Sequence, residues 1–176
     1  MEPYKTETAK GLPVLIVPDA RALLAENTTL KHYIAETWRK SMQRDDIYKR
    51  HITLRNDAIW SRIERLLASP LTTVTLAVWP EGGSEGDGEL FVVGWLVTGP
   101  GPTVHYAYVR ERYRGAGVVK ELLKTATEDG FFACTHWSEK LPSSGMFGRP
   151  INGPYFEYVG MDWVPQATSK GADAND

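Results

Sequence analysis

The sequence RYRGAG occupies residues 112–117, between a strand-like segment at residues 104–109 and a helix-like segment at residues 118–128. A strand that turns through glycines into a helix leaves backbone N–H groups without partners, and these groups add to the positive end of the helix dipole. Gly115 and Gly117 let the backbone come close to a bound group. The segment therefore predicts a cradle for an anion such as a pyrophosphate.

Other interpretations of this glycine pair fit the sequence less well. A dinucleotide fingerprint needs a third glycine at position 120, which is Lys120, and a P-loop needs a Gly-Lys-Ser/Thr sequence that the chain lacks. The simplest alternative is a glycine turn that begins an ordinary helix. The preceding strand and the following amphipathic helix favour the cradle, because this context distinguishes such motifs from chance glycine pairs.

The spacing Arg-x-x-Gly-x-Gly at residues 112–117 resembles the acetyl-coenzyme A signature of the GCN5-related N-acetyltransferase (GNAT) superfamily, as does the longer phrase YVRERYRGAGVVKELL. The resemblance implies that the pantetheine arm of acetyl-coenzyme A lies along the strand ending at Val109, whose N–H polarises the thioester carbonyl. A donor oriented in advance in this way lowers a barrier by about 3 to 4 kcal/mol. The residues expected to bind the cofactor are Tyr108, Val109, Arg112, Arg114, Gly115, Ala116, Gly117, Val118 and Asn152.

The rest of the chain predicts an α/β fold with a mixed, mostly antiparallel sheet flanked by helices. The first dozen residues are polar and expected to be loose. Periodicity and turn residues place the elements in the order of the GNAT plan over residues 12–137. The expected elements are an edge strand at residues 12–17, a helix from about residue 28 with apolar positions to residue 42, a helix at 56–68, strands at 72–79, 90–97 and 104–109 with a hairpin loop at 81–88, a helix at 118–128 and a strand at 131–137.

The C-terminal part departs from the family plan and is expected to be shortened or irregular. The phrase YFEYVGM at residues 155–161 looks like the family phrase whose tyrosine protonates the departing thiolate, but that position is Phe156 here. The candidate acid is its neighbour Tyr155, although a one-residue shift on a helix turns a side chain by about 100°. Only residues 162–164 resemble a final strand before a polar tail. An uncovered sheet edge there would be a place for pairing in a homo-oligomer or a larger assembly.

Two histidines are candidates for the base that deprotonates the acceptor amine, because their ordinary pKa suits this role. His105 lies on the strand before the cradle and His136 lies on the next expected strand. Strand alternation places His105 opposite Tyr106 and Tyr108, so only one set can face the cleft. A lone histidine in a strand also commonly has a structural role.

Composition favours one domain over residues 1–165 with a polar tail at 166–176. The 176 residues are 42% hydrophobic, and the single Cys134 cannot form an internal disulfide, which favours a cytoplasmic location. No apolar run is long enough to span a membrane, and no histidine or cysteine spacing predicts a metal site. The net charge of -2 gives no general reason to expect a nucleic-acid partner. Residues 31–65 are locally basic, which makes an acidic substrate or a nucleic acid conceivable, but a solvated helix face is the favoured interpretation.

The sequence thus predicts a transferase that moves an acetyl group from acetyl-coenzyme A to an amine on a small molecule or a protein. The alternative is a catalytically degenerate GNAT-fold module that serves interaction or structure within a larger assembly, for example a virus particle. The unusual Phe156 and the short C-terminal part motivate this alternative.

Overall fold

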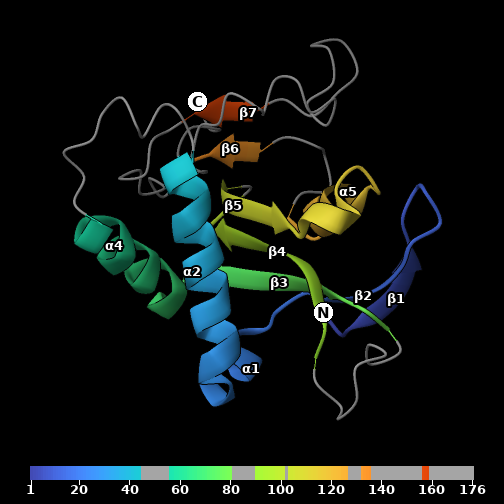
Figure 1. Cartoon of the computed structure of the whole chain (residues 1–176), viewed down its shortest axis with the longest axis horizontal. Coiled ribbons are helices and arrows are strands. Elements are labelled where there is room, and N and C mark those ends of the chain that lie inside the picture. The colour runs from blue at the N-terminus through green and yellow to red at the C-terminus, as the bar shows by residue number, and fades with distance from the viewer. Residues whose placement is uncertain (45–55, 81–89, 102, 127–131, 136–155, 159–176) are drawn as a thin grey trace, which may run out of the picture.

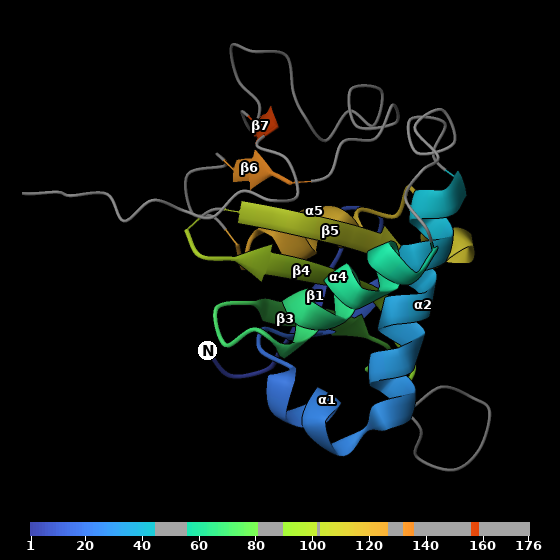
Figure 2. The same cartoon turned by 90° about the vertical axis from the view of Figure 1, so that its left-hand side faces the viewer.

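A computed structural model describes residues 1–44, 56–80, 90–101, 103–126, 132–135 and 156–158. Within them, one sheet has its strands in chain order from β1 to β7. Figure 1 shows α2 crossing in front of this sheet, and Figure 2 shows α4 in front of it and α5 behind it. The strands are β1 (Tyr4–Glu7), β2 (Pro13–Val17), β3 (Thr73–Val78), β4 (Val92–Gly99), β5 (Thr103–Val109), β6 (Phe132–Cys134) and β7 (Phe156–Tyr158); the helices are α1 (Arg21–Glu26), α2 (Thr28–Arg44), α4 (Asn56–Ala68) and α5 (Val118–Leu123), with the 3₁₀ turn η1 (Glu111–Tyr113).

The sheet is mixed, and most of it is antiparallel. Each pair of neighbours from β1 to β5 is antiparallel, whereas β6 runs parallel to β5 and β7 runs parallel to β6. This confirms the predicted α/β class with a mixed, mostly antiparallel sheet and helices. In the described part of the chain, β6 pairs with β5 at Thr103 and Val104 only.

Two apolar layers hold the helices to the sheet. One face carries Trp95 and the buried side chains of α2 and α4, whose apolar positions recur at helical spacing. The other face packs Leu96, Val109 and neighbouring apolar residues against Val118 and Leu122 of α5. The helix α2 begins where expected, because the Asn27 side chain accepts a hydrogen bond of 2.9 Å from the Leu30 N–H.

Two β-bulges change the direction of side chains next to the centre of the sheet. In β4, Ala77 pairs with Gly94 and Val78 with Val92, which leaves Val93 as the extra residue. In β5, Val97 pairs with Tyr106 and Thr98 with Val104, which leaves His105 as the extra residue. Past this second bulge, Tyr106 and Tyr108 face the layer of α2.

The N-terminal region differs from the prediction. Residues 4–7 were expected to be loose, but they form β1 and pair with β2 from Tyr4↔Ile16 to Glu7↔Pro13. The predicted edge strand at residues 12–17 is therefore an inner strand, between β1 and β3. The alternating exposure of β1 explains why a polar sequence can form an edge strand, because its outer face carries Lys5 and Glu7. The short helix α1 was also not predicted.

The later elements agree with the prediction in type and differ in detail. The helix α5 ends at Leu123, earlier than the predicted end at residue 128, and residues 127–128 lie outside the described part. The helical geometry considered for the phrase at residues 155–161 is wrong for its centre, because Phe156–Tyr158 is a strand beside β6. Aromatic residues are frequent in strands, so pairing with β6 overrides any helical tendency there. The predicted hairpin loop at 81–88, the strand at 162–164 and the tail lie outside the described residues.

Gly94 tests the packing at the first bulge. A Cβ at this position would lie 2.7 Å from the Tyr108 carbonyl oxygen and 3.2 Å from a methyl group of Val109. We expect Gly94→Ala to lower the free energy of unfolding by about 1 to 3 kcal/mol in urea denaturation. The control is Gly101→Ala, which has φ +61 and no atom within 4 Å of the added methyl, and should lose only about 1 kcal/mol from backbone strain. Equal losses would contradict this account.

Candidate functional site

The cradle predicted at residues 112–117 connects β5 to α5 through two glycines in left-handed conformations. The turn η1 follows β5, and Gly115 and Gly117 then adopt φ values of 75° and 93°. These values favour glycine, because a Cβ would strain the backbone there. Gly117 is also the N-cap of α5, and no side chain caps that helix end.

Some backbone N–H groups of the cradle make hydrogen bonds within the protein. The N–H of Tyr113 donates to the Arg110 carbonyl, and the N–H of Ala116 donates to the Tyr113 carbonyl at 3.3 Å. The Ala116 N–H is therefore hydrogen-bonded within the loop. The N–H groups of the first turn of α5, residues 118–120, precede the first intrahelical bond, which Glu121 makes to Gly117. These N–H groups are therefore available to donate to an anion.

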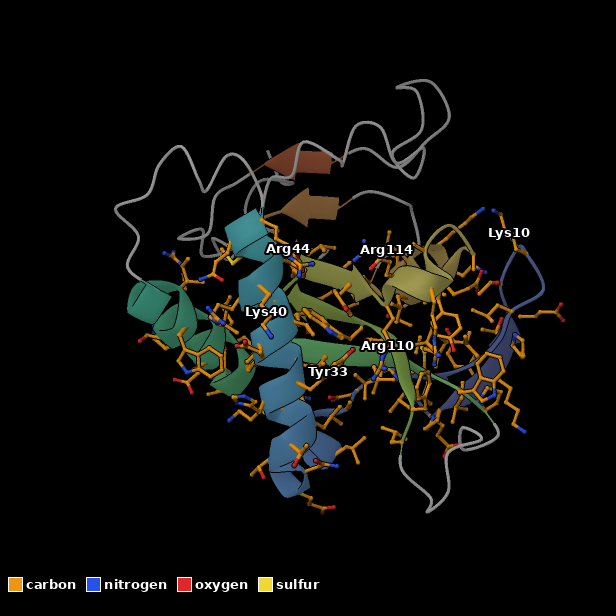
Figure 3. The ribbon with its side chains drawn as sticks, viewed as in Figure 1. Lys10, Tyr33, Lys40, Arg44, Arg110 and Arg114 are labelled. Atoms are coloured by element: carbon orange, nitrogen blue, oxygen red, sulfur yellow. The ribbon has the colours of Figure 1, made fainter. Side chains whose placement is uncertain are left out.

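The loop between β1 and β2 lies against the cradle. A Cβ built on Gly117 would be 3.5 Å from the Ala9 nitrogen and 3.6 Å from the Thr8 Cβ, and one built on Gly115 would be 3.9 Å from the Lys10 Nζ. The Thr8 hydroxyl and carbonyl accept hydrogen bonds from the N–H groups of Leu12 and Gly11, which fixes this tight turn. Lys10 thus adds a cation that the motif did not reveal (Figure 3).

Two arginines that the resemblance assigned to the cofactor take different directions. Arg114 turns back to β5, where its Nε donates to the Val109 carbonyl at 3.2 Å. Arg112 lies over the rings of Phe91 and Tyr113, with its guanidinium carbon 4.7 and 4.8 Å from the ring centroids. Arg114 and Lys10 are therefore the cations close to the glycines, and Arg112 lies over aromatic rings.

In the described part of the chain, no strand pairs with the end of β5 on the side of β6. The Arg110 N–H donates to the Val93 carbonyl at 2.9 Å, so this pair is a hydrogen-bonded pair of the β4/β5 ladder. Because such pairs alternate in antiparallel strands, the next pair, Val109 and Gly94, is not hydrogen-bonded. The Val109 N–H consequently points away from β4, toward the side where the described residues of β6 pair with the first two residues of β5.

His105, one of the two candidate bases, is buried. It is 6% exposed, and its Nδ1 lies 3.0 Å from the Thr135 hydroxyl. Its Nε2 fills the space beside Gly99, where an added Cβ would be only 2.7 Å away. Burial lowers the pKa of His105 to about 4, so the ring is neutral at pH 7 and a weak base. This environment favours a structural role.

A second group of side chains meets at the opposite face of the β5 end. Arg110 lies with its guanidinium carbon 5.1 Å from the ring centroid of Tyr33 and 4.5 Å from that of Phe91. Burial raises the pKa of the Tyr33 phenol, the nearby Arg110 charge opposes that rise, and Tyr108 adds to it. Figure 3 shows Tyr33 on α2 beside Arg110. Neither Tyr33 nor Arg110 was predicted as a site residue.

The remaining predicted site residues, His136, Asn152 and Tyr155, lie outside the described part of the chain. Among the described residues, no group of three histidines, cysteines or carboxylates is placed to hold a metal ion. None of the helices within those residues is long and apolar enough to cross a membrane.

Comparison with known proteins gives no identification. No protein-family model, curated protein or solved structure matches this sequence. The geometry of the β5 end and the cradle is therefore the basis for inferring a function.

The burial of His105 predicts a specific pH dependence of stability. Its folded pKa of about 4 lies below the ordinary value of 6.5, so the unfolded chain binds more protons between these values. This histidine should therefore cost roughly 2 kcal/mol of the free energy of unfolding when the pH falls from 7 to 5. Urea denaturation at both pH values measures the loss.

The matched variants are His105→Asn, which should reduce the pH dependence, and His32→Gln, which replaces an exposed histidine and should retain it. A wild-type dependence that survives in His105→Asn would contradict the buried, neutral state.

Proposed function

We propose that this protein is a GNAT-type N-acetyltransferase that moves an acetyl group from acetyl-coenzyme A to an amine. The observation that carries the proposal is the Val109 N–H at the edge of β5, a few residues before the glycine cradle, which points away from β4 and has no hydrogen-bond partner among the described residues. The order of elements from β2 to β6 is consistent with the GNAT plan. In this order α5 lies between β5 and β6 in the sequence, and these two strands are parallel.

The residues of the cradle fit a pyrophosphate. Its glycines leave room where side chains would intrude, and the first turn of α5 presents N–H groups that no side chain caps. Lys10 and Arg114 supply positive charge on two sides of the loop. A diphosphate would thus be bound by backbone donors and by cations from segments far apart in the sequence.

The Val109 N–H would act on the acyl group. Acetyl-coenzyme A would supply a thioester. The amine nitrogen would form a bond to the acetyl carbon, the carbon–sulfur bond would break with release of the coenzyme A thiolate, and the proton lost by the amine would balance the thiolate, giving an amide and free coenzyme A thiol. Charge develops on the carbonyl oxygen during this transfer, and a backbone donor fixed by the sheet needs no rearrangement to stabilise it. Its neighbours in β4 hold it in place, because Arg110 is hydrogen-bonded to Val93.

One observation favours the alternative of a degenerate GNAT-fold module. The candidate base His105 is buried beside Gly99 and Thr135, which leaves the role of base to a residue other than His105. Acetyl transfer to any amine in a broad acceptor screen would exclude this alternative, whereas binding of the cofactor without turnover would support it.

Gly115 provides the direct test of the cofactor site. We expect acetyl-coenzyme A to bind the wild type with micromolar affinity in calorimetric titration, and Gly115→Glu to weaken binding more than tenfold, because its carboxylate would enter the cradle and repel phosphate.

The matched control is Gly101→Glu. This glycine also has a positive φ, of 61°, but lies in open space at the turn between β4 and β5. The control should bind like the wild type. No binding by the folded wild type would make the interaction module the better proposal.

Lys10 gives an independent test of where the phosphates lie. Replacing this exposed cation beside Gly115 in Lys10→Gln should weaken acetyl-coenzyme A binding about threefold at low salt, with the difference shrinking as salt screens the charge. The control, Lys5→Gln, removes an exposed charge from β1 itself. An equal effect of both variants would point to a general charge effect and not to a site beside Gly115.

A further inference from the structure

An aromatic cluster fills the layer between α2 and the strands β4 and β5. Trp38 of α2 lies 5.9 Å from Trp95 and 5.4 Å from Tyr106, measured between ring centroids, and Trp95 stacks on Tyr108 at 5.6 Å. Tyr33 extends the cluster toward the end of β5. The cluster therefore runs from the middle of the sheet to Arg110.

This cluster contains unsatisfied hydrogen-bond donors. In the described part of the chain, three buried side-chain nitrogen or oxygen atoms have no hydrogen-bond partner: the indole nitrogens of Trp38 and Trp95 and the Nε of Arg110. Both tryptophans are 0% exposed. All three atoms are donors, and a buried donor without an acceptor is unfavourable, because it has lost its hydrogen bonds to water. The two indole groups are enclosed in the packed layer, whereas the half-buried Arg110 lies at the end of β5, where its guanidinium can donate to a group that accepts hydrogen bonds.

Arg110 gives this place its charge. None of the ion pairs among the described residues includes Arg110, and its guanidinium instead lies over the rings of Tyr33 and Phe91. By contrast, Arg39 on α2 is paired with Glu36 at 2.7 Å. A guanidinium held between aromatic rings is partly desolvated, which strengthens its interaction with an anion.

The position of Arg110 relates it to the proposed reaction. Arg110 directly follows Val109, but the two residues face opposite directions because of strand alternation. Val109 belongs to the apolar layer of α5, and Tyr33 and Tyr108 belong to the layer of α2. A ligand held by Arg110 would thus lie on the α2 face of the strand whose edge carries the Val109 N–H.

We propose that Arg110, with the hydroxyl of Tyr33, binds the carboxylate of the acceptor, so that the acceptor is an amine that also carries a carboxylate, such as an amino acid. The identity of the ligand as an acceptor rests on the proposed function; the carboxylate site does not. A planar guanidinium donates two parallel hydrogen bonds to a carboxylate. Arg110 and Arg112 both lie over Phe91, but Arg110 is the cation that also lies over Tyr33. One guanidinium beside one hydroxyl suits a single negative charge, whereas the cradle offers the several donors that a diphosphate requires.

The test is calorimetric titration of matched probes into the full chain, alone and saturated with coenzyme A. The pairs are glycine and glycinamide, leucine and leucinamide, phenylalanine and phenylalaninamide, and lysine and lysinamide, with inorganic phosphate as a further probe. The amides keep the amine and remove the negative charge. At least one acid should bind about tenfold more tightly than its amide, as expected for a charge-assisted pair.

Four variants test whether the preference for acids over amides arises from Arg110 and Tyr33. Arg110→Gln should abolish the preference, Arg110→Lys should retain part of it, and Tyr33→Phe should reduce it about threefold. Arg44→Gln, at the exposed end of α2, makes the same change of charge and should leave the preference intact (Figure 3). Thermal unfolding of each variant verifies that it is folded, and Arg110→Lys keeps the test valid where Arg110→Gln does not fold.

The possible results separate the two proposals. Equal binding of acids and amides, no binding of any acid, a preference that survives Arg110→Gln, or tighter binding of phosphate than of every acid would overturn the carboxylate site. A carboxylate preference in a protein that does not bind acetyl-coenzyme A would uphold the site and reject the acetyltransferase.

Discussion

The packing of Trp38 against Trp95 and Tyr106 is the contact on which the described architecture depends. It joins α2 to β4 and β5 through three large rings, two of them fully buried. Such rings contribute more buried area than any other side chains, and their tilted and stacked arrangement fixes the angle between helix and sheet. Because α2 is fixed in this way, Tyr33 comes to lie beside Arg110 and the α2 face of β5 becomes a defined surface.

The bulge at His105 separates two parts of β5 that differ in their pairing. Before His105, the strand is paired on both sides, with β4 and with β6. After His105, it keeps its pairing with β4 while the described part of β6 has ended. The extra residue also turns Tyr106 and Tyr108 toward α2, so the irregularity at His105 builds the aromatic face. A bulge next to a site commonly aims side chains in this manner.

The predictable part of the molecule was the part whose pattern is local. The apolar spacing of α2 and α4 and the β-rich runs of β3 to β6 each reflect a property of a few neighbouring residues, and the structure confirms these elements. The strand β1 escaped prediction because its polar sequence is stabilised by pairing with β2, which is a tertiary effect. The same holds for α1, a helix of six residues that is too short to show a period.

The part of the candidate site that lies in one short motif was predictable. The residues that the fold brings to it from distant segments were not. The glycines at 115 and 117 have the left-handed conformations that the motif suggests. Lys10 was not predicted as a site residue, because it reaches the cradle from the β1/β2 turn, about a hundred residues earlier in the chain. Arg110 carried a signal that was available, since it continues the alternation of Tyr106 and Tyr108. The burial of His105 carried no such signal, because its environment depends on Gly99 and Thr135, which no local pattern connects to it.

The contact between the β1/β2 turn and Gly117 links the cradle to the outermost strand of the sheet. Since β1 has β2 as its one strand partner in the described sheet, it is held less firmly than the inner strands, and opening of this hairpin would withdraw Thr8, Ala9 and Lys10 from the loop. A ligand that touches these residues binds the closed hairpin and stabilises it by mass action. Occupancy of the cradle would therefore be visible as slower hydrogen exchange in β1, a strand that contributes no residue to the motif itself.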